Sequence, residues 1–415
     1  MKKYRKFKMF LLFAIATVLL LSGCSSSSGA DEGGKDGVKT IRFATWDSEE
    51  TLDLQQDLVD KFNAEHDKIN VVLEAYGADF DTKIAAGMGG NDAPDVMYMW
   101  NYPLYKDALE PLDSYIEKEG EGYKDNFYDA LWNYNTQNEK VLGLPVGYTT
   151  HVVYYNKTLF DEKGIDYPEA GWTWEELQET AKKLTDKEKK ISGFAFSGQP
   201  DPYDFEMYLW SNGTSYVDKE GKLKGKINSS ESIEVFDMFQ DMLKKGYAVT
   251  TEGSGATEMK SGKVAMFVNG AWSLGTLTEA GIDYGVIELP KFDNGKSVSI
   301  ISSSGIAMSK DSKHKEAAFE FMKYWTGEEA NKQRIEYELP VLKSLVEKEK
   351  LEEDPVKSVF YSMLEKSDGY TPSSYLVEDW SVVSESLNLA FEQIFNPSTL
   401  MEPKKALNEV SEMSE

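Results

Sequence analysis

Two tryptophans near the start of the chain are each followed by a residue that can form hydrogen bonds. Trp46-Asp47 ends the β-rich run 40–46, and Trp100-Asn101 ends the run 96–100. An aromatic ring beside a hydrogen-bonding group suits a sugar, because the ring stacks on the apolar C–H face while the polar group replaces water on the hydroxyls. We interpret these four residues as candidate ligand contacts. The alternatives are that the tryptophans fill a core and that Asp47 is a solvated loop acid.

Alternating strands and helices must position these pairs. The run 40–46 is followed by apolar residues at helical spacing over 52–62, by a second β-rich run at 69–73 and, after another helical stretch, by the run at 96–100. This alternation is typical of parallel α/β sheets. Ligands of such sheets lie beyond the carboxyl ends of the strands, which is where both pairs fall. The sequence therefore predicts an α/β fold with a binding site at that edge.

The first residues are typical of an export signal. Residues 1–8 contain five basic residues and no acid, and 9–21 is an apolar run shorter than the roughly 20 residues of a membrane-spanning helix. We predict a secretory signal peptide over 1–23. The only cysteine, Cys24, ends Leu21-Ser22-Gly23-Cys24, which resembles the lipobox of bacterial lipoproteins.

The lipobox resemblance implies cleavage before Cys24 and a lipid on its sulfur. Residues 24–38 have the composition of a flexible tether, so we expect the mature protein to be anchored by lipid on the extracellular face of the cell membrane. The alternative is a chance free thiol near a signal peptide.

Charge and histidine content exclude several classes of partner. A formal net charge of −26 argues against nucleic acid or anionic lipid, since both require a cationic surface. The three histidines, His66, His151 and His314, are widely spaced without a thiol partner, so no zinc or iron site is expected. The acid-rich loops 125–129 and 291–295 do not match an EF-hand, and we interpret them as solvated turns. We expect no cofactor.

Arginine is scarce after the signal peptide. Only Arg42 and Arg334 remain, and Arg42 lies in the middle of a predicted strand, away from the expected site. Binders of amino acids, organic acids or phosphate esters usually hold the anion with a bidentate arginine. Because no well-placed arginine is visible, a neutral, polyhydroxylated ligand fits the sequence better than an anion.

Six stretches of the chain, taken in the order in which they occur, resemble the sequence of a known protein family. They are TIRFATW through DLVDKFNAEH, APDVMYMW, VVYYNKTLFDEKGI followed by TWEEL, GKVAMFVNGAW, SSSGIAMSKDSKHKEAAFEFMKYW, and YELPVLKS. In this order they resemble the extracellular solute-binding proteins of carbohydrate ABC importers, the group that includes maltodextrin-binding proteins. One departure is Met259, where the family usually has an aromatic residue.

The resemblance implies a two-lobe α/β fold of the periplasmic-binding-protein type II. Three crossings of the chain between lobes would fall near 146–149, 302–305 and 339–341. Lobe 1 would then comprise 39–147 and 305–339, and lobe 2 would comprise 148–304 and 340–415. A mature chain of roughly 390 residues also favours two domains.

The resemblance also implies further site residues. Trp272 in NGAWSL matches the family's stacking tryptophan, Tyr148 and Ser304 fall at the first two crossings, and Trp210 and Trp380 are expected as aromatic contacts from lobe 2. Each tryptophan has an alternative role as core filler. For Trp174 the core role is favoured, because its place in a capping box directs it toward its own helix.

From these features we expect a monomeric, non-enzymatic lipoprotein that binds a sugar or oligosaccharide outside the cell. It would deliver this ligand to the transmembrane subunits of an ABC permease. Two alternatives stay open. One is the same fold with a polyamine or a glycerophosphodiester as ligand, and the other is a secreted glycosidase, which would need two carboxylates flanking a glycosidic bond.

Overall fold

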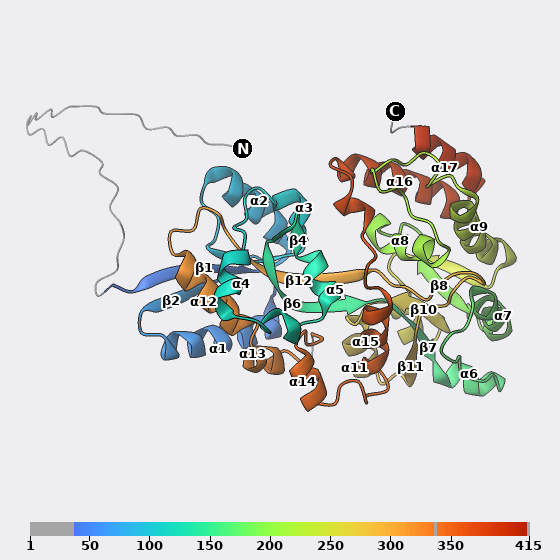
Figure 1. Cartoon of the computed structure of the whole chain (residues 1–415). Helices are drawn as coiled ribbons and strands as arrows, with labels where there is room; N and C mark the ends of the chain where they lie inside the picture. The colour runs from blue at the N-terminus through green and yellow to red at the C-terminus, as the bar shows by residue number, and fades with distance from the viewer. Residues whose placement is uncertain (1–36, 336–337, 413–415) are drawn as a thin grey trace, which may run out of the picture.

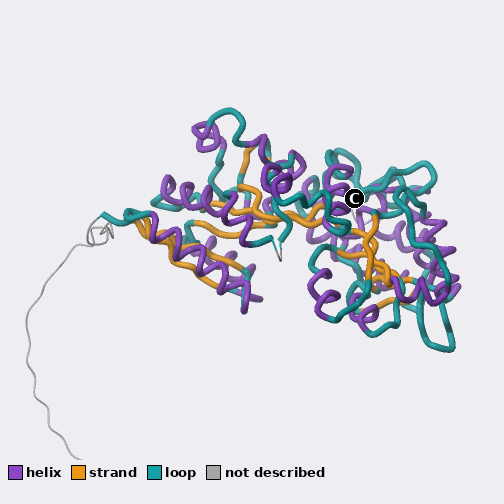
Figure 2. Tube along the Cα trace, turned by 90° about the horizontal axis from the view of Figure 1, so that it is seen from below, coloured by secondary structure: helices purple, strands orange, loops and turns teal. Residues whose placement is uncertain are grey.

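The computed structural model describes residues 37–335 and 338–412 of the chain. They form two α/β lobes that lie side by side and are joined by strands through the middle of the molecule (Figure 1). Seen from below, each lobe consists of strands with helices packed around them (Figure 2). The predicted fold class is therefore confirmed.

The sheet of lobe 1 has the strand order β2-β1-β3-β12-β6. Its strands are β1 (Lys39–Thr45), β2 (Ile69–Ala75), β3 (Val96–Met99), β6 (Gly143–Thr150) and β12 (Ile301–Met308). β1 pairs in parallel with β2 and β3, whereas β12 runs antiparallel to β3 and β6. The three β-rich runs of the sequence correspond to β1, β2 and β3, so Trp46 and Trp100 each lie one residue beyond the carboxyl end of a strand.

Helices cover this sheet and complete the core of lobe 1. The indole of Trp325 contacts the ring of Phe43 edge-on at 4.7 Å between ring centroids, and both side chains are fully buried. The helices of the lobe are α1 (Glu49–Glu65), α2 (Phe80–Gly90), α3 (Tyr102–Tyr105), α4 (Asp113–Glu119), α5 (Asp129–Tyr134), α12 (Lys315–Trp325), α13 (Glu328–Gln333) and α14 (Lys343–Lys348), with short 3₁₀ turns at Gly77–Asp79 and Lys124–Asn126 and a two-stranded hairpin of β4 (Thr136–Gln137) and β5 (Lys140–Val141).

The sheet of lobe 2 has the strand order β11-β7-β10-β8-β9. Its strands are β7 (Val152–Asn156), β8 (Phe194–Ser197), β9 (Ala248–Thr251), β10 (Met266–Asn269) and β11 (Tyr284–Ile287). β8 pairs in parallel with β9 and β10, and β7 runs antiparallel to β10 and β11. The carboxyl ends of β8, β9 and β10 therefore share one edge of the sheet.

The helices of lobe 2 follow their sequence signals. The predicted capping box is present, with Thr173 Oγ1 accepting from Glu176 N and Glu176 Oε2 accepting from Thr173 N. Trp174 is buried in the core, as predicted. The helices are α6 (Lys157–Lys163), α7 (Trp174–Leu184), α8 (Pro202–Ser211), α9 (Ser230–Lys245), α10 (Ala256–Lys260), α11 (Ser273–Glu279), α15 (Lys357–Lys366), α16 (Trp380–Phe395) and α17 (Pro403–Glu412), with a 3₁₀ turn at Ser373–Tyr375.

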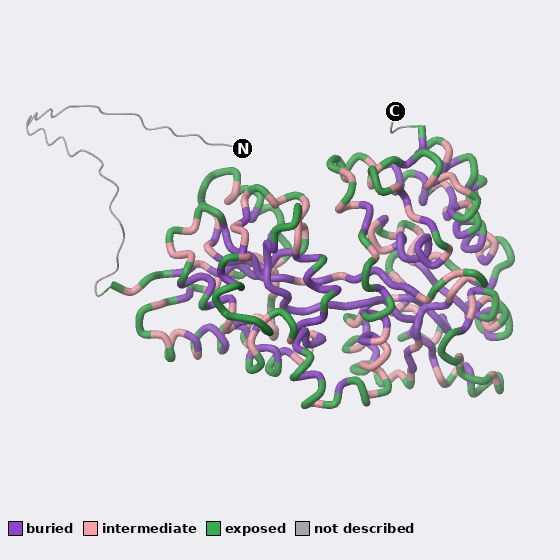
Figure 3. Tube along the Cα trace, in the orientation of Figure 1, coloured by how far each residue is buried: buried purple, intermediate pink, exposed green. Residues whose placement is uncertain are grey.

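Two of the passages between lobes are made by β6 and β12, which are buried along most of their length (Figure 3). Their ladder runs from Gly143 opposite Ala307 to Thr150 opposite Ile301, and β7 begins at Val152. The expected lobe boundaries at 147/148 and 304/305 fall inside this ladder. Pairing continues past them because buried backbone groups need hydrogen-bond partners along the whole length of both strands.

The third passage also differs in position from the expectation. Leu339 forms a β-bridge with Tyr148, and Leu342 forms one with Phe127. These bridges hold the segment against lobe 1, and α14 packs beside α13. The chain therefore stays with lobe 1 beyond the expected boundary at 339/340. It next reaches α15, which contacts both β6 and β7.

Membrane-spanning helices and metal-binding groups were searched for only in residues 37–335 and 338–412, the part of the chain that the structure describes. In those residues no helix has the length and apolarity needed to cross a membrane. No group of three or more histidine, aspartate or glutamate side chains there could hold a metal ion. The predicted signal peptide, Cys24 and most of the tether lie outside the described residues.

Candidate ligand-binding site

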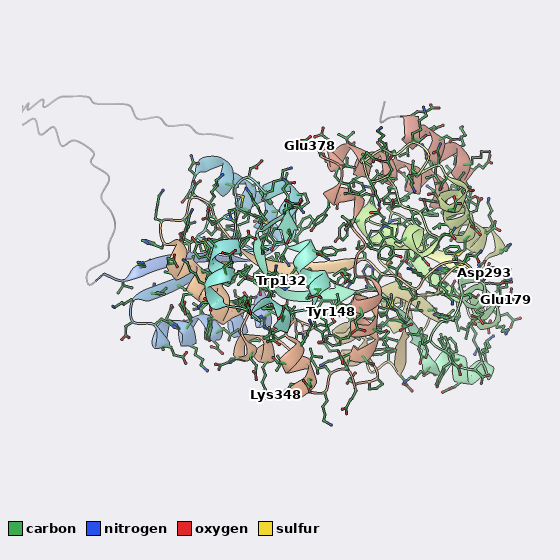
Figure 4. All side chains as sticks on the ribbon, in the orientation of Figure 1. Trp132, Tyr148, Glu179, Asp293, Lys348 and Glu378 are labelled. Carbon is green, nitrogen blue, oxygen red and sulfur yellow. The ribbon has the colours of Figure 1, made fainter. Side chains whose placement is uncertain are left out.

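A pocket of about 460 Å³ lies between the lobes, at the carboxyl ends of β1 and β3. This volume is within the range of small-molecule sites, roughly 300 to 1,000 Å³. Tyr148, one of its lining residues, marks the place where the strands pass from one lobe to the other (Figure 4). The pocket is lined by Trp46, Gly77, Ala78, Phe80, Asp81 and Trp100 of lobe 1, by Tyr148, Thr149, Ser302, Ser303 and Ser304 of the passing strands, by Ala271 and Trp272 of lobe 2, and by Glu338 and Leu339.

Two tryptophans present their rings to this pocket from opposite lobes. Trp100 is 52% exposed and Trp272 is 53% exposed, whereas most other tryptophans of the described chain are buried. Trp46 is half-buried and rests against Phe80 and Tyr98. An exposed indole is unfavourable in water, so two of them in one pocket indicate a surface that a ligand covers.

Local contacts orient both exposed rings. The indole Nε1 of Trp100 donates to Asp81 Oδ1 at 3.1 Å. The indole of Trp272 lies against Gly270, where a Cβ would come within 2.6 Å of the ring, so the close approach requires glycine. Its position is further set by a hydrogen bond from Ala271 N to Thr149 Oγ1 at 2.7 Å, which ties the Trp272 loop to β6.

A charged pair, Glu338 and Arg334, lies beside the serines that line the pocket. Glu338 accepts from Ser304 Oγ at 3.0 Å and from Arg334 Nε at 2.9 Å. Arg334 is 1% exposed, donates through Nη2 to Trp325 O, and lies 5.2 Å from the centroid of the Trp325 ring. Burial raises the pKa of Glu338, and the charge of Arg334 opposes this shift. The Glu338 carboxylate can therefore accept a hydrogen bond from a ligand in the pocket, while the buried Arg334 balances its charge.

The structure brings five of the nine predicted site residues into the pocket. Trp46, Trp100, Tyr148, Trp272 and Ser304 all line it. Tyr148 is buried, and its ring contacts Tyr361 edge-on at 5.7 Å. Ligand contact by these five residues stays a prediction, although their placement around one pocket agrees with it.

The four other predicted residues, Asp47, Asn101, Trp210 and Trp380, do not line this pocket, and ligand contact by them stays a prediction. Asp47 turns inward, where its carboxylate accepts from Thr45 Oγ1 and Gln55 Nε2, and burial raises its pKa. Asn101 caps α3, with Oδ1 accepting from Leu104 N at 3.3 Å. Both side chains therefore have local structural roles.

The two remaining predicted tryptophans belong to the body of lobe 2. Trp210 is only 5% exposed and packs against Tyr370 at 5.3 Å between ring centroids. Trp380 is half-buried at the start of α16 and faces Tyr216. The core alternative thus holds for Trp210, and Trp380 does not reach the pocket.

Sequence reasoning missed several polar residues of the pocket. Asp81, Thr149 and Glu338 line it, yet Asp81 and Thr149 lie in segments without a distinctive motif, and Glu338 lies in the stretch YELPVLKS without having been singled out there. The only available signal was position, since Thr149 and Glu338 adjoin expected crossings of the chain.

The two arginines are unavailable to a ligand for different reasons. Arg42 pairs with Glu74 and Asp92 on the outer part of lobe 1, in agreement with its predicted place away from the site. Arg334 is close to the pocket, but it is buried and paired with Glu338. Among the described residues that line the pocket, the charged ones are Asp81 and Glu338, both acidic. An anionic ligand would therefore find no cation there.

Two α/β lobes joined by several passages of the chain, with a polar and aromatic pocket between them, define the architecture of a solute-binding protein. The model of one family, described as bacterial extracellular solute-binding protein, matches residues 46–332. The chain belongs to this family.

Individual relatives extend the match to most of the chain. A galactooligosaccharide-binding protein of Bacillus subtilis (strain 168) is 28% identical over 363 residues, covering 83% of this chain and 82% of the relative. An arabinooligosaccharide-binding protein of the same strain is 24% identical over 430 residues, with 96% of each chain covered.

Solved structures show the same architecture. An ABC substrate-binding protein of Listeria monocytogenes, solved in complex with cycloalternan, matches with a TM-score of 0.77 at 25% identity, covering 91% of this chain and 98% of the other. UgpB of Mycobacterium tuberculosis, solved in complex with glycerophosphocholine, matches with a TM-score of 0.78 at 21% identity, covering 91% and 98%. The second likeness concerns the fold alone.

Proposed function

We propose that this protein is a receptor for a neutral oligosaccharide and delivers it to the permease of an ABC importer. The observation that carries the proposal is the placement of Trp100 and Trp272, whose exposed rings line one pocket from opposite lobes. A sugar ring presents an apolar C–H face to an indole and hydroxyls to the serines, Thr149 and Glu338 around it. The relatives named as oligosaccharide-binding proteins support the same ligand class.

Transport then works through a shift in population. A ligand that contacts both lobes stabilises the closed arrangement, because only that arrangement makes both sets of contacts. The permease would recognise the closed, loaded form. No bond of the ligand is made or broken in this scheme, so the protein acts as a binder and not as an enzyme.

The polyamine alternative has one observation in its favour. Asp81 and Glu338 place two carboxylates in the pocket, and no described cation lines it. The Glu338 charge is already balanced by Arg334, however, which leaves less attraction for a cation than the residue count suggests. A glycerophosphodiester is disfavoured because, among the described residues that line the pocket, there is no arginine or lysine to hold its phosphate.

A ligand screen tests the proposal. The purified protein is heated with galactose, galactobiose, galactotriose, the corresponding arabinose and glucose series, spermidine and glycerophosphocholine. A ligand that binds only the folded state raises Tm with concentration. We expect a rise with at least one neutral oligosaccharide, and recovery of that sugar intact by chromatography. A rise with spermidine alone would favour the polyamine receptor, and shortened sugar products would favour the glycosidase.

We further propose that the protein is a monomeric lipoprotein, anchored through Cys24 on the outer face of the cell membrane. The signal-like segment and the lipobox-like sequence LSGC support this placement. Cells that express the full chain are grown with an alkyne-labelled fatty acid. We expect label on the wild-type protein in the membrane fraction and none on Cys24→Ala. Equal labelling of the two proteins would contradict the assignment of Cys24, and size-exclusion chromatography with light scattering tests the monomer.

A further inference from the structure

Asp81 is the acid of the pocket that lies beside an exposed tryptophan. It is the second residue of α2, it lines the pocket between the lobes, and its Oδ1 accepts from the indole Nε1 of Trp100 at 3.1 Å. The Trp100 side chain is 52% exposed. A ligand ring that stacks on this indole would therefore lie next to the Asp81 carboxylate.

The charge of Asp81 is not balanced by a neighbouring cation. Within residues 37–335 and 338–412 its carboxylate takes part in no ion pair, whereas Glu338 pairs with Arg334 at 2.9 Å. The next lysine along α2, Lys83, places its Nζ over the ring of Tyr76, 5.0 Å from the ring centroid. Asp81 therefore presents an unpaired negative charge to the pocket.

The other charged groups around the pocket do not offset this charge. Among the described residues that line it, the second charged one is Glu338. Burial raises the pKa of Glu338, and the nearby carboxylate of Asp47 adds to this shift. Arg334 acts on both of these carboxylates, so one buried arginine faces two acids. The electrostatic field in the pocket is therefore negative.

A negative pocket sorts ligands by charge. Two like charges about 4 Å apart in water repel strongly enough to lower affinity roughly fivefold, and the repulsion grows where the lobes exclude water. An ammonium group would instead be attracted by Asp81 and by the face of the Trp100 indole. A hydroxyl group can donate to the carboxylate without either charge effect.

We propose that Asp81 is a specificity-determining residue, which excludes saccharides with a carboxylate near Trp100 and favours a ring that carries an amine there. The inference rests on the proposed function and deepens it, because it divides the possible sugars by charge. Uronic acids are rejected, neutral sugars are accepted, and amino sugars bind more tightly than their neutral counterparts.

Matched derivatives of one disaccharide test this selection. The parent is galactobiose or its glucose or arabinose counterpart, whichever raises Tm most in the ligand screen. One derivative carries a carboxylate in place of a primary hydroxymethyl group, a second carries the uncharged carboxamide of the same shape, and a third carries an amine in place of the primary hydroxyl. Each is prepared on either ring, and calorimetry gives Kd. We expect the wild type to bind the carboxylate at least about fivefold more weakly than the carboxamide, and the amine at least about threefold more tightly than the parent.

An isosteric variant assigns the selection to Asp81. Asp81→Asn removes the charge and keeps an oxygen that can accept from Trp100 Nε1, so both affinity ratios should move most of the way to one, whatever happens to the Kd of the parent. Asp293→Asn is the control, because Asp293 is exposed on the outer side of lobe 2, away from Tyr148 at the pocket, and its loss changes the net charge equally (Figure 4). This control should keep both wild-type ratios.

The outcomes separate the selection from the function. Equal wild-type affinities for carboxylate and carboxamide would overturn the inference and leave the receptor intact, as would unchanged ratios in Asp81→Asn or equal changes in Asp81→Asn and Asp293→Asn. Should Asp81→Asn not fold, salt decides, because screening weakens an exposed charge: the wild-type ratios should shrink between about 20 mM and 500 mM NaCl, and ratios independent of salt would overturn the selection. Failure of the wild type to bind any saccharide would overturn the proposed function and this inference with it.

Discussion

Arg334 Nε donates to Glu338 Oε2 at 2.9 Å beneath the pocket, and Ser304 Oγ donates to the other oxygen of the same carboxylate at 3.0 Å. The arginine is 1% exposed and the glutamate side chain is 18% exposed. The pair therefore connects the core of lobe 1 with the wall of the pocket. Removing one partner from such a pair leaves an uncompensated buried charge, which is costlier than removing both.

Replacement of Arg334 should destabilise the fold. We expect Arg334→Met to lower the free energy of unfolding by about 3 to 5 kcal/mol, and Arg334→Met with Glu338→Gln to recover most of it. Urea denaturation measures both values. Arg42→Met is the matched control, because Arg42 forms a partly exposed pair with Glu74 and should lose no more than about 1 kcal/mol. Equal losses for Arg334→Met and Arg42→Met would contradict the role of burial.

Truncation of either exposed tryptophan should weaken sugar binding. Trp272→Ala and Trp100→Ala remove stacking contacts worth about 1 to 3 kcal/mol, or roughly five- to 150-fold in Kd. Calorimetry with the saccharide that raises Tm gives these values. Tyr167→Ala removes another exposed aromatic ring, which is 40% exposed and packs against Tyr155 and Phe160 in lobe 2, and it should leave Kd unchanged. A folded tryptophan variant with unchanged Kd would remove that residue from the site.

Loss of the Thr149 hydroxyl should loosen the Trp272 loop. Thr149→Val leaves the partly buried Ala271 N without its acceptor, and an unpaired N–H at such a position costs up to about 1 to 3 kcal/mol. Because the loop carries Trp272, we expect weaker sugar binding and an altered tryptophan emission spectrum. Thr149→Ser keeps the acceptor and should bind within about twofold of the wild type. Wild-type affinity in Thr149→Val would show that the hydrogen bond does not position the ring.

Gly147 should tolerate no side chain. A Cβ at this position would overlap the carboxyl group of Glu338, whose oxygens are held by Arg334 and Ser304. We expect Gly147→Ala to destabilise the protein by about 1 to 3 kcal/mol and to weaken sugar binding. Gly89→Ala is the control, since Gly89 lies in α2 with open space around its Cβ position and the change should be neutral or stabilising by up to about 1 kcal/mol. Similar unfolding free energies for the two variants would contradict the predicted overlap.

Acid should destabilise the wild type partly through His151. Burial lowers the pKa of this histidine to about 4 in the folded protein, against the usual 6.5 of a histidine in water. Between these values the unfolded chain binds more protons, so this contribution is present above pH 6.5 and is lost as the pH falls toward 4. At pH 5 the loss is about 2 kcal/mol.

The variant His151→Leu should lack this component. Its unfolding free energy relative to the wild type should therefore improve by about 2 kcal/mol between pH 7.5 and pH 5 in urea titrations. Asp204 and Glu206, whose pKa values are raised by burial, act in the opposite direction, but they do so in both proteins and cancel in the comparison. A pH-independent difference between the two proteins would contradict the low pKa of His151.

The main features of the fold were predictable from local sequence signals. The runs around Thr40, Ile69 and Val96 are strands, and the capping box at Thr173 begins a helix, because these signals depend on residues close together in the chain. The two tryptophans after β1 and β3 also reached the pocket, since carboxyl ends of neighbouring parallel strands share one edge of a sheet.

The polar partners of those tryptophans were not predictable. Asp47 and Asn101 follow Trp46 and Trp100 directly, yet one turns inward to Thr45 and Gln55 and the other caps α3. Once a strand ends, the direction of each next side chain depends on the hydrogen bonds that the turn must satisfy. Asp47 and Asn101 therefore do not line the pocket, although each follows a tryptophan that does.

By itself, the sequence determined the α/β class, the order of the elements and the scarcity of arginine. Tertiary structure alone decided which aromatic rings remain exposed, since Trp210 is buried by Tyr370 while Trp272 is left open over Gly270. It also decided that Glu338 and Ser304 lie together and that His151 is buried. The reason is physical: burial and orientation are set by contacts between segments far apart in the chain, and no local pattern encodes them.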